Sequence, residues 1–304
     1  MQGAIHLGIS LDSQSIHTYT SDAAGHERLR AREPLSSNSA SLLDTLKRLV
    51  NKSRIQFGEL KALTLSCSEY FTATNSLHQP SPEQLASALS QTFTIDCQLV
   101  SHSQAAAMHV SAHHQRLLSV SLGDSCGLAL FENGKLRPSR LCETWAHSEL
   151  PGFDWLVDGL TPVCRCSSEH CIEQFLSVGG IERQYHQIVL QDKPLAVIFA
   201  GVANAVPTDT RVYRTFIDQL ARSLAKPINE LMPETLLLSG DVVCHGRIND
   251  DLLVALSRYI DVSLLPDSIT LSSDAFALLR VRHSSRKKIT TIVFSPHDDN
   301  DNLK

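Results

Sequence analysis

Apolar and polar residues alternate in short blocks along the first half of the chain. Three apolar runs, separated by Asp-Ser and Asp-Ala-Ala-Gly turn residues, predict a meander of strands at Ile5–Ile9, Ser15–Thr20 and His26–Arg32. Leucines and valine at helical spacing predict a helix at 41–50. Strands and helices then alternate, and we expect strands at Leu60–Ser66 and Ile95–Val100 and helices at 82–92 and 104–114.

The second half repeats this rhythm and begins with another pair of strands. Leu117–Leu122 and Gly127–Phe131 predict a hairpin, which the Asn-Gly dipeptide within 132–135 would close as a type I′ turn. Helices follow at 172–205 and 210–231, and Pro227 should kink or split the second helix near Ala225. The last unit comprises strand Thr235–Ser239, helix Asp250–Tyr259 and strand Ser268–Leu271.

Two successive α/β units, each opening with antiparallel strands, predict a duplicated architecture. We expect an N-terminal α/β domain over 1–116 and a C-terminal α/β domain over 117–304. A ligand would bind in the cleft between them, since small-molecule sites are common between domains. The first strand begins at Ile5 with no helix-turn-helix ahead of it, which weakens a DNA-binding interpretation.

Composition narrows the class of protein. The 304 residues are 42% hydrophobic and 19% charged with a formal net charge of -5, so bulk charge favours no nucleic-acid partner. The opening residues lack the pattern of a signal peptide, and no segment approaches the roughly 20 apolar residues of a membrane helix, so we expect a cytoplasmic protein without a membrane partner. Thiols stay reduced in the cytoplasm, and the eight cysteines are therefore expected to be free or to bind metal.

The stretch CRCSSEHC places three cysteines, Cys164, Cys166 and Cys171, on one tight loop. Thiolates this close repel one another unless a cation neutralises them, and tetrahedral zinc needs a fourth ligand of the Cys or His type. We expect His147 to be that ligand, with His170 as the competitor; the alternative is three reduced thiols that bind nothing. A closed Cys3His zinc site leaves no position for water, so its role would be to pin the loop over 147–171.

Several segments resemble the ROK family of sugar kinases and sugar-responsive repressors, and especially its bacterial N-acetylglucosamine kinases. The similar segments are SLGDSCGLALFENGKL at 121–136, His147 with the cysteine block and Glu173, and LMPETLLLSGDVV at 231–243. The resemblance implies a two-domain, ribonuclease H-like fold of the actin/hexokinase type. It also implies a chain that is often dimeric, with sugar in the cleft and ATP beside it.

The resemblance also implies sugar-binding residues. Glu143 and His147 correspond to the Glu and His of the family's Glu-x-Gly-His motif, and Glu173 corresponds to its second sugar-binding glutamate. Glu173 has an equal alternative, as an acid favoured by the dipole at the start of a helix. Trp145, inside the first motif, is expected in the core rather than stacked on a sugar.

The segments that would bind ATP depart from the family pattern. The family's glycine-rich phosphate loops here carry Asp12, Asp124 and Asp241, and a carboxylate repels a polyanion. Near the nucleotide base, Asp274-Ala275-Phe276 stands in place of Asp-Ala-Gly. We therefore expect this chain to bind neither ATP nor Mg²⁺.

The residue at the position of the catalytic base also departs from the family pattern. The family's Asn-Asp pair, whose Asp takes the sugar hydroxyl proton, aligns with Ser101-His102. His102 has the chemistry of a base, but without positioned ATP and Mg²⁺ it has no reaction to assist, and a structural role is the alternative.

Two functions follow from these residues. The first is a catalytically degenerate ROK protein that senses an amino sugar or hexose and acts as a homodimer or with a protein partner. The second is an active ATP-dependent kinase for N-acetylglucosamine or glucose. A DNA-binding repressor is disfavoured because no DNA-binding segment is evident.

Overall fold

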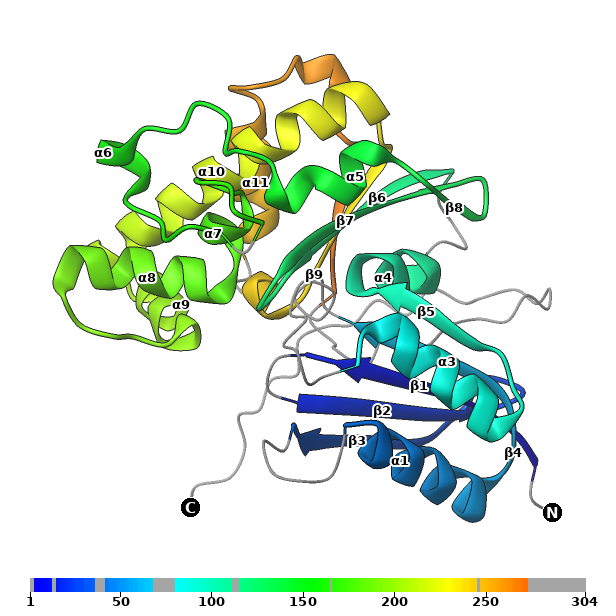
Figure 1. Ribbon diagram of the computed structural model, residues 1–304. Helices are drawn as coiled ribbons and strands as arrows, with labels where there is room; N and C mark the ends of the chain where they lie inside the picture. Colours follow the sequence, from blue (N-terminus) through cyan, green and yellow to red (C-terminus); the bar gives the residue numbers. More distant parts are fainter. Residues whose placement is uncertain are drawn as a thin grey trace, which may run out of the picture.

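The computed structural model contains two mixed five-stranded sheets with helices packed against them (Figure 1). It describes residues 3–12, 15–35, 42–67, 80–110, 115–164, 166–244 and 247–272. One sheet uses strands from the first half of the chain and the other uses strands from the second half. The prediction of two successive α/β units is confirmed, whereas the domain boundary at 116/117 stays a prediction.

The first sheet has the order β3-β2-β1-β4-β5. Its antiparallel strands are β1 (Gly3–Leu11), β2 (Ser15–Asp22) and β3 (Glu27–Pro34), and β4 (Gly58–Cys67) and β5 (Cys97–Ser101) extend it in parallel from β1. Helices α1 (Leu42–Phe57) and α3 (Pro82–Phe93) pack against it, and their leucines share one apolar core with the strands. A capping box in which Ser81 and Gln84 exchange hydrogen bonds begins α3.

The second sheet has the order β10-β9-β6-β7-β8. Its strands are β6 (Arg116–Leu122), β7 (Cys126–Glu132), β8 (Lys135–Arg137), β9 (Thr235–Ser239) and β10 (Ser268–Ser272). The prediction that the Asn-Gly turn closes the β6–β7 hairpin is wrong. Asn133 and Gly134, with φ of 51° and 79°, instead join β7 to β8, and residues 123–125 join β6 to β7. Strand β8 has three residues, which is too short to show a period along the sequence.

Several helices of the second half lie beside this sheet. They are α5 (Arg140–Thr144), η2 (Trp145–His147), α6 (Trp155–Asp158), α7 (Glu173–Leu176), α8 (Val178–Val189), α9 (Leu195–Ala203), α10 (Pro207–Leu231), η3 (Asp241–Cys244), α11 (Ile248–Leu256) and η4 (Val262–Leu264). The segment predicted as helical at 172–205 is divided into α7, α8 and α9. Ser177 is extended and caps Gly180 to begin α8, and Pro194 precedes α9.

Pro227 does not split the helix, because α10 runs from Pro207 to Leu231 with Pro227 inside it. The kink at this position stays a prediction. Proline has no N–H for the carbonyl four residues earlier, which belongs to Ser223. The indole Nε1 of Trp145 donates to that carbonyl at 2.9 Å. The hydrogen bond that proline removes is therefore replaced from outside the helix, and Trp145 is a core residue, as the sequence predicts.

Helix α4 (His102–Val110) connects the two sheets. It leaves β5 of the first sheet, and its Ala105, Ala106 and Ala107 pack with Leu117 and Leu237 of the second sheet. Alanines let the helix approach both sheets closely, and its first residue, His102, lies at the junction. Residues 111–114 of this predicted helix lie outside the described part of the chain.

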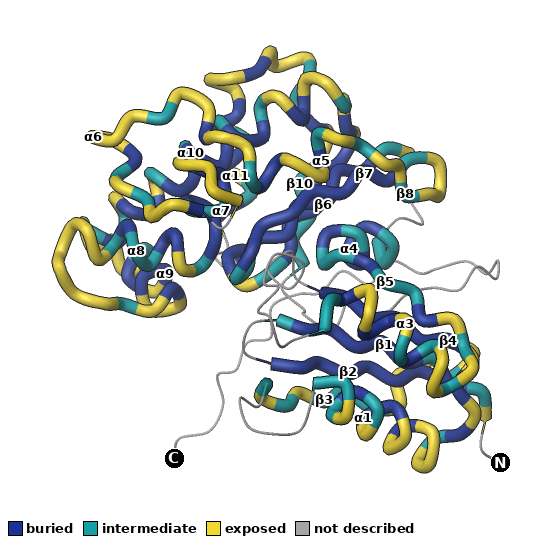
Figure 2. The backbone as a smooth tube through the Cα atoms, in the orientation of Figure 1, coloured by how far each residue is buried: buried dark blue, intermediate teal, exposed yellow. Residues whose placement is uncertain are grey.

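Figure 2 shows that buried residues concentrate in the inner strands of both sheets, whereas the segment around α6 is largely exposed. Within the described residues, no helix combines the length and the apolar character that crossing a bilayer requires.

Candidate functional site

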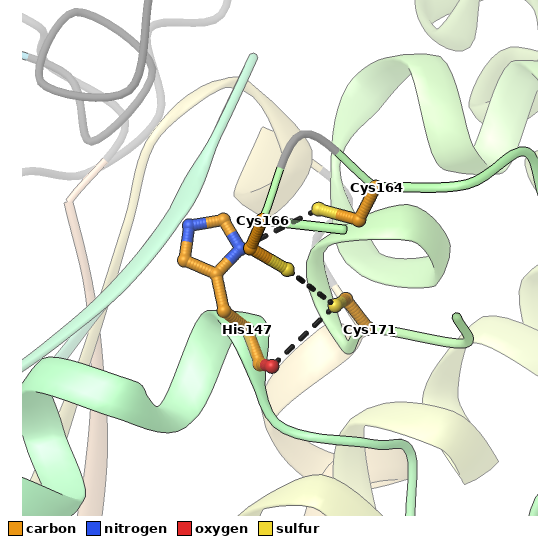
Figure 3. Close-up of side chains that lie close together, drawn as sticks. All are labelled: His147, Cys164, Cys166 and Cys171. Carbon is orange, nitrogen blue, oxygen red and sulfur yellow. Dashed lines mark hydrogen bonds between the residues drawn. The ribbon is translucent and has the colours of Figure 1, made fainter. Parts of the chain in front are cut away.

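Four potential metal ligands lie together beside α7 (Figure 3). His147 comes from η2, Cys164 and Cys166 from the loop after α6, and Cys171 from the segment that enters α7. One ligand atom of each lies within 4.8 Å of the other three. Nδ1 of His147 is 3.6 Å from Sγ of Cys164, and Sγ of Cys166 is 3.3 Å from Sγ of Cys171. The structure thus brings together the four ligands that the sequence predicts.

The geometry and the donor chemistry of this cluster fit zinc. Tetrahedral Zn²⁺ binds sulfur at about 2.3 Å and nitrogen at about 2.0 Å, which places two ligands of one ion roughly 3.5–3.8 Å apart. The separations of 3.6 and 3.3 Å are close to these values. Three thiolates and one imidazole fill the coordination of a structural zinc ion, so such an ion here would retain no position for water.

Backbone hydrogen bonds position the ligands before any metal binds. Ile172 N donates to Ser148 O at 2.9 Å, which ties the end of η2 to the start of α7. Cys164 N donates to Ser168 O at 3.0 Å and closes a tight turn in which Ser167 has a left-handed φ of 67°. The cysteine loop is therefore folded by its own backbone rather than extended into solvent.

The thiols of the cluster differ in acidity. Desolvation opposes ionisation of Cys166, but hydrogen bonds from Ser168 and the neighbouring thiols outweigh it and lower the pKa of Cys166 to about 6. Desolvation raises the pKa of Cys171, and its hydrogen bond to Cys166 raises it further. Close thiols therefore oppose each other's ionisation, and a bound cation is the usual means of ionising all of them.

His170, the competing ligand considered from the sequence, is not part of the cluster. Its ring stacks on Phe153 with centroids 3.8 Å apart, and its Nδ1 lies 3.2 Å from Oγ1 of Thr161. These contacts use the ring face and one nitrogen of His170. The geometry therefore favours His147 as the fourth ligand.

The two glutamates implied as sugar contacts occupy different environments. Glu173 begins α7, two residues after Cys171, and its Oε2 accepts a hydrogen bond from Cys126 N at 3.3 Å. Glu143 lies in α5 and is exposed. The ring nitrogen of His147 that does not face Cys164 is directed away from the three sulfur atoms (Figure 3). Glu173 is thus the glutamate that the cysteine loop positions.

Three aspartates from separate segments lie within electrostatic reach of one another. They follow β1 (Asp12), occupy the β6–β7 loop (Asp124) and begin η3 (Asp241). Asp241 is exposed, yet the protein atoms packed around it raise the pKa of its carboxyl, and the charges of Asp124 and Asp12 raise it further. Like charges gathered in this way favour a cation and disfavour an anion.

The carboxylate of Asp12 is already engaged by its own hairpin. It accepts hydrogen bonds from the backbone N of Ser15 at 2.5 Å and from Oγ of Ser15, and its Oδ2 is 3.0 Å from Nε2 of His17. The turn between β1 and β2 is therefore organised around this carboxylate.

His102 begins α4 directly after β5, with its Nε2 3.0 Å from Oγ of the buried Ser10. Burial lowers the pKa of its imidazole to about 4, although Asp12 and Asp124 oppose the shift. The ring is therefore neutral at pH 7, and its Nε2 is directed at Ser10.

A cavity of about 610 Å³ lies beside two of these aspartates. Asp124 and Asp241 are among its lining residues, and so are Glu182, Leu195 and Phe199. Sequence reasoning missed these last three residues because they occupy ordinary positions of α8 and α9, with no spacing that signals a site. Asp274–Phe276, considered near the nucleotide base, lie outside the described residues.

The two mixed sheets and their helices define an actin-like α/β protein of the kind that hexokinases form. The model of the ROK family matches residues 6–265, and the chain therefore belongs to the ROK family. The fold class and the family predicted from the sequence are both confirmed.

Curated relatives are distant kinases. An N-acetyl-D-glucosamine kinase of Yersinia pseudotuberculosis is 26% identical over 149 residues, which cover 47% of this chain and 49% of that protein. An N-acetylgalactosamine kinase of a Shewanella species is 25% identical over 201 residues, which cover 62% of this chain and 60% of that protein. The matches thus span between half and three fifths of these relatives.

Solved structures match over a longer part of the chain. A ROK family glucokinase from Streptomyces griseus, in complex with glucose and AMPPNP, has a TM-score of 0.71 at 16% identity and covers 91% of this chain and 97% of its own. A ROK family transcriptional regulator has a TM-score of 0.72 at 12% identity, with coverage of 92% and 77%. Kinases and a regulator share this fold, so the fold does not decide between phosphorylation and regulation.

Proposed function

We propose that this ROK protein binds an amino sugar or hexose without phosphorylating it and works as a sugar sensor. One observation carries the proposal: Asp12, Asp124 and Asp241 lie within electrostatic reach of one another in the segments that correspond to the family's phosphate loops. A sugar kinase must hold a nucleotide triphosphate there, and phosphate loops do so with backbone amides and cations. Three carboxylates oppose that binding by their charge.

The surroundings of His102 support the same proposal. A base for phosphoryl transfer must face the sugar hydroxyl and lie near the γ-phosphate. Nε2 of His102 is 3.0 Å from Ser10 Oγ, and its pKa of about 4 makes it a weak base at pH 7. His102 is therefore better suited to joining β5 to β1 than to taking a proton.

A zinc ion held by His147, Cys164, Cys166 and Cys171 completes the proposed binding site. The ion would neutralise the thiolates and cross-link η2 to the segment before α7. The protein would then present the second nitrogen of His147 and the carboxylate of Glu173 to sugar hydroxyls, with Glu143 as a further contact. Charged groups that accept or donate to hydroxyls give sugars their orientation.

The protein partner we propose is a second copy of the chain. Trp155, Leu156, Val157, Leu160 and Val163 each expose 61–69% of their surface, and we call these five residues the α6 apolar surface. All five lie within the nine residues 155–163, and exposed apolar side chains gathered in this way often mark a protein–protein interface. This surface supports a homodimer.

The segment that carries the α6 apolar surface is tied to α8 and α10 by side-chain contacts. A loop that only faces solvent would not require such contacts. Arg222 pairs with the buried Asp158, and Gln187 Nε2 donates to Leu160 O at 2.6 Å. Buried, paired charges are costly to displace. These contacts restrain the backbone that carries the apolar side chains, which favours recognition by a complementary partner.

The alternative function is an ATP-dependent kinase for N-acetylglucosamine or glucose, and the similarity to curated kinases favours it. A coupled assay of ADP release with a hexose and N-acetylhexosamine panel separates the two. We expect no sugar-dependent ADP release from the wild type or from His102→Asp, because that substitution leaves three carboxylates in the phosphate segments. Sugar-dependent turnover of the wild type at about 1–100 per second would establish the kinase instead. In either case we expect the protein in the cytoplasm.

A further inference from the structure

The cavity beside α9 has an unusual distribution of charge for a member of a nucleotide-binding family. Three of its ten described lining residues carry carboxylates, namely Asp124, Glu182 and Asp241, and the other seven are apolar. None of these ten is Lys, Arg or His. Its volume of about 610 Å³ falls within the range of small-molecule sites, roughly 300–1,000 Å³. The cavity therefore combines an apolar wall with a negative charge.

Lys193 and the N-terminus of α9, which lie next to the lining residues Pro194 and Leu195 in the chain, are already engaged. Nζ of Lys193 lies 2.8 and 2.6 Å from the two carboxylate oxygens of the buried Asp209. Oε1 of Glu182 accepts from the backbone N of Leu195 at 2.8 Å, at the first residue of α9. The partial positive charge of that helix end is thus offset by Glu182. Neither Lys193 nor the N-terminus of α9 is therefore left to bind a phosphate group in the cavity.

The acidic end of the cavity favours a cation. The charges of Asp124 and Asp12 raise the pKa of Asp241, and its interactions with Arg32 and His17 offset this repulsion in part. A ligand ammonium group donates to carboxylates in charge-assisted hydrogen bonds and lowers the repulsion between them. A phosphate group would raise it.

We propose that this cavity binds an organic amine with an apolar body, whose ammonium group lies at the Asp124 and Asp241 end and whose body packs along α9. The apolar wall formed by Leu195, Phe199 and Ala200 suits an aromatic or branched aliphatic body. His147 and Glu173 are not among the described lining residues. The amine site is therefore separate from the sugar contacts and adds a second ligand to the proposed function.

Three indole compounds of similar size test the charge preference: tryptamine, the neutral tryptophol and the anionic indole-3-propionate. Isothermal titration calorimetry at pH 7 on the full chain should show tryptamine binding. We expect tryptophol to bind about tenfold or more weakly than tryptamine, in line with the loss of a hydrogen bond to a charged group. We expect no detectable binding of indole-3-propionate. Equal binding of the neutral or the anionic compound would overturn the proposal, and so would no binding of tryptamine.

Two matched pairs of variants locate the site. Asp241→Asn should weaken tryptamine binding about tenfold or more, whereas Asp267→Asn, which makes the same charge change beside the opposite end of β9, should leave it unchanged. Ala200→Trp fills the cavity at an exposed position of α9 and should abolish binding. Val197→Trp adds the same side chain at an exposed position of the same helix that is not among the described lining residues, so binding should persist.

Two further outcomes keep the proposal distinct from the proposed function. Wild-type tryptamine affinity in Ala200→Trp would place the amine elsewhere and overturn the inference. Mg²⁺-AMPPNP binding that Ala200→Trp removes would identify a nucleotide site and overturn it as well. N-acetylglucosamine binding, measured on the same variants, should be unaffected by Ala200→Trp. A loss of the amine site with sugar binding retained would therefore leave the sugar sensor intact.

Discussion

His170 stacks on Phe153 at a centroid distance of 3.8 Å, and its ring is not among the four clustered ligands. His147 is therefore the histidine that completes the proposed zinc site. The stacking decides between two ligands that sequence spacing alone leaves open, because both lie close in sequence to the three cysteines.

We predict about one zinc ion per chain, bound by a Cys3His set. His147→Ala should lower the zinc content and the thermal midpoint, since a three-ligand site binds more weakly and the loop is then less restrained. His170→Ala should keep the zinc. Elemental analysis of the purified, untagged protein measures the zinc content of each variant, and thermal unfolding measures the midpoint. Equal zinc content in the wild type and His147→Ala would move the fourth ligand elsewhere.

We predict that sugar binding depends on Glu173. Glu173→Gln keeps an oxygen that accepts from Cys126 N but removes the charge, and it should weaken N-acetylglucosamine binding about tenfold. Glu169→Gln changes an exposed glutamate of the same loop, whose side chain is 73% exposed, and serves as the control. Calorimetry with N-acetylglucosamine and glucose gives the comparison. Identical affinities of the two variants would separate Glu173 from the sugar.

We predict an acid-sensitive contribution of His102 to stability. Its pKa is lowered to about 4 in the folded chain, mainly by burial, so the folded state binds fewer protons than the unfolded state between that value and about 6.5. This contribution is fully present above pH 6.5 and is lost as the pH falls toward 4. It amounts to about 1–3 kcal/mol after allowance for solvent screening. His102→Gln should flatten the pH dependence of unfolding in this window, and an unchanged slope would contradict the shift.

We predict that Asp241→Asn stabilises the protein at neutral pH. The pKa of Asp241 is raised in the fold, so stability falls as the pH rises through that raised value. The amide removes this loss, and the thermal midpoint at pH 7 should increase by about 1–2 °C, a small effect because Asp241 is exposed. The gain should shrink as the pH falls through the raised pKa of Asp241, because the wild-type carboxyl then becomes protonated. A decrease at pH 7 would show that Asp241 is stabilised by its positive neighbours instead.

We predict that the chain is a dimer that a single charge disrupts. Leu156→Glu places a carboxylate in the α6 apolar surface and should produce monomers. Val254→Glu introduces the same charge at an exposed position of α11 and should remain dimeric. Sedimentation velocity at several concentrations distinguishes the two states. A wild-type monomer at about 10 μM, which lies well above the Kd of a typical standard-size interface, would rule out this interface.

The helices, the strands and the metal ligands could be predicted from the sequence because each depends on residues that are close together in the chain. The leucine spacing in 42–50 and the run at Thr235–Ser239 each reflect a single period, and the structure has α1 and β9 at these places. The cysteines and His147 lie within 25 residues, so chemistry and spacing were sufficient to group them. The choice of His147 over His170 still required coordinates, because it depends on which way each ring points.

The cavity could not be predicted from the sequence, because it depends on how distant segments come together in the fold. Asp124 and Asp241 are far apart in sequence, and the parallel pairing of β6 with β9 brings their loops to the same edge of the sheet. Gly240 makes this approach possible: with φ of 101°, it lies so close to the Leu122 backbone that a Cβ atom would be 2.3 Å from the Leu122 oxygen. Such a contact leaves no periodic pattern in the sequence.

The hydrogen bond from Trp145 to Ser223 makes a proline at position 227 tolerable, because it supplies the donor that proline lacks. In an ancestor without the indole, a proline at 227 would have left a buried carbonyl without its donor, at a cost of about 1–3 kcal/mol. In relatives of this protein, we expect proline at the position of Pro227 to occur together with tryptophan at the position of Trp145. Tryptophan at that position should also occur without the proline.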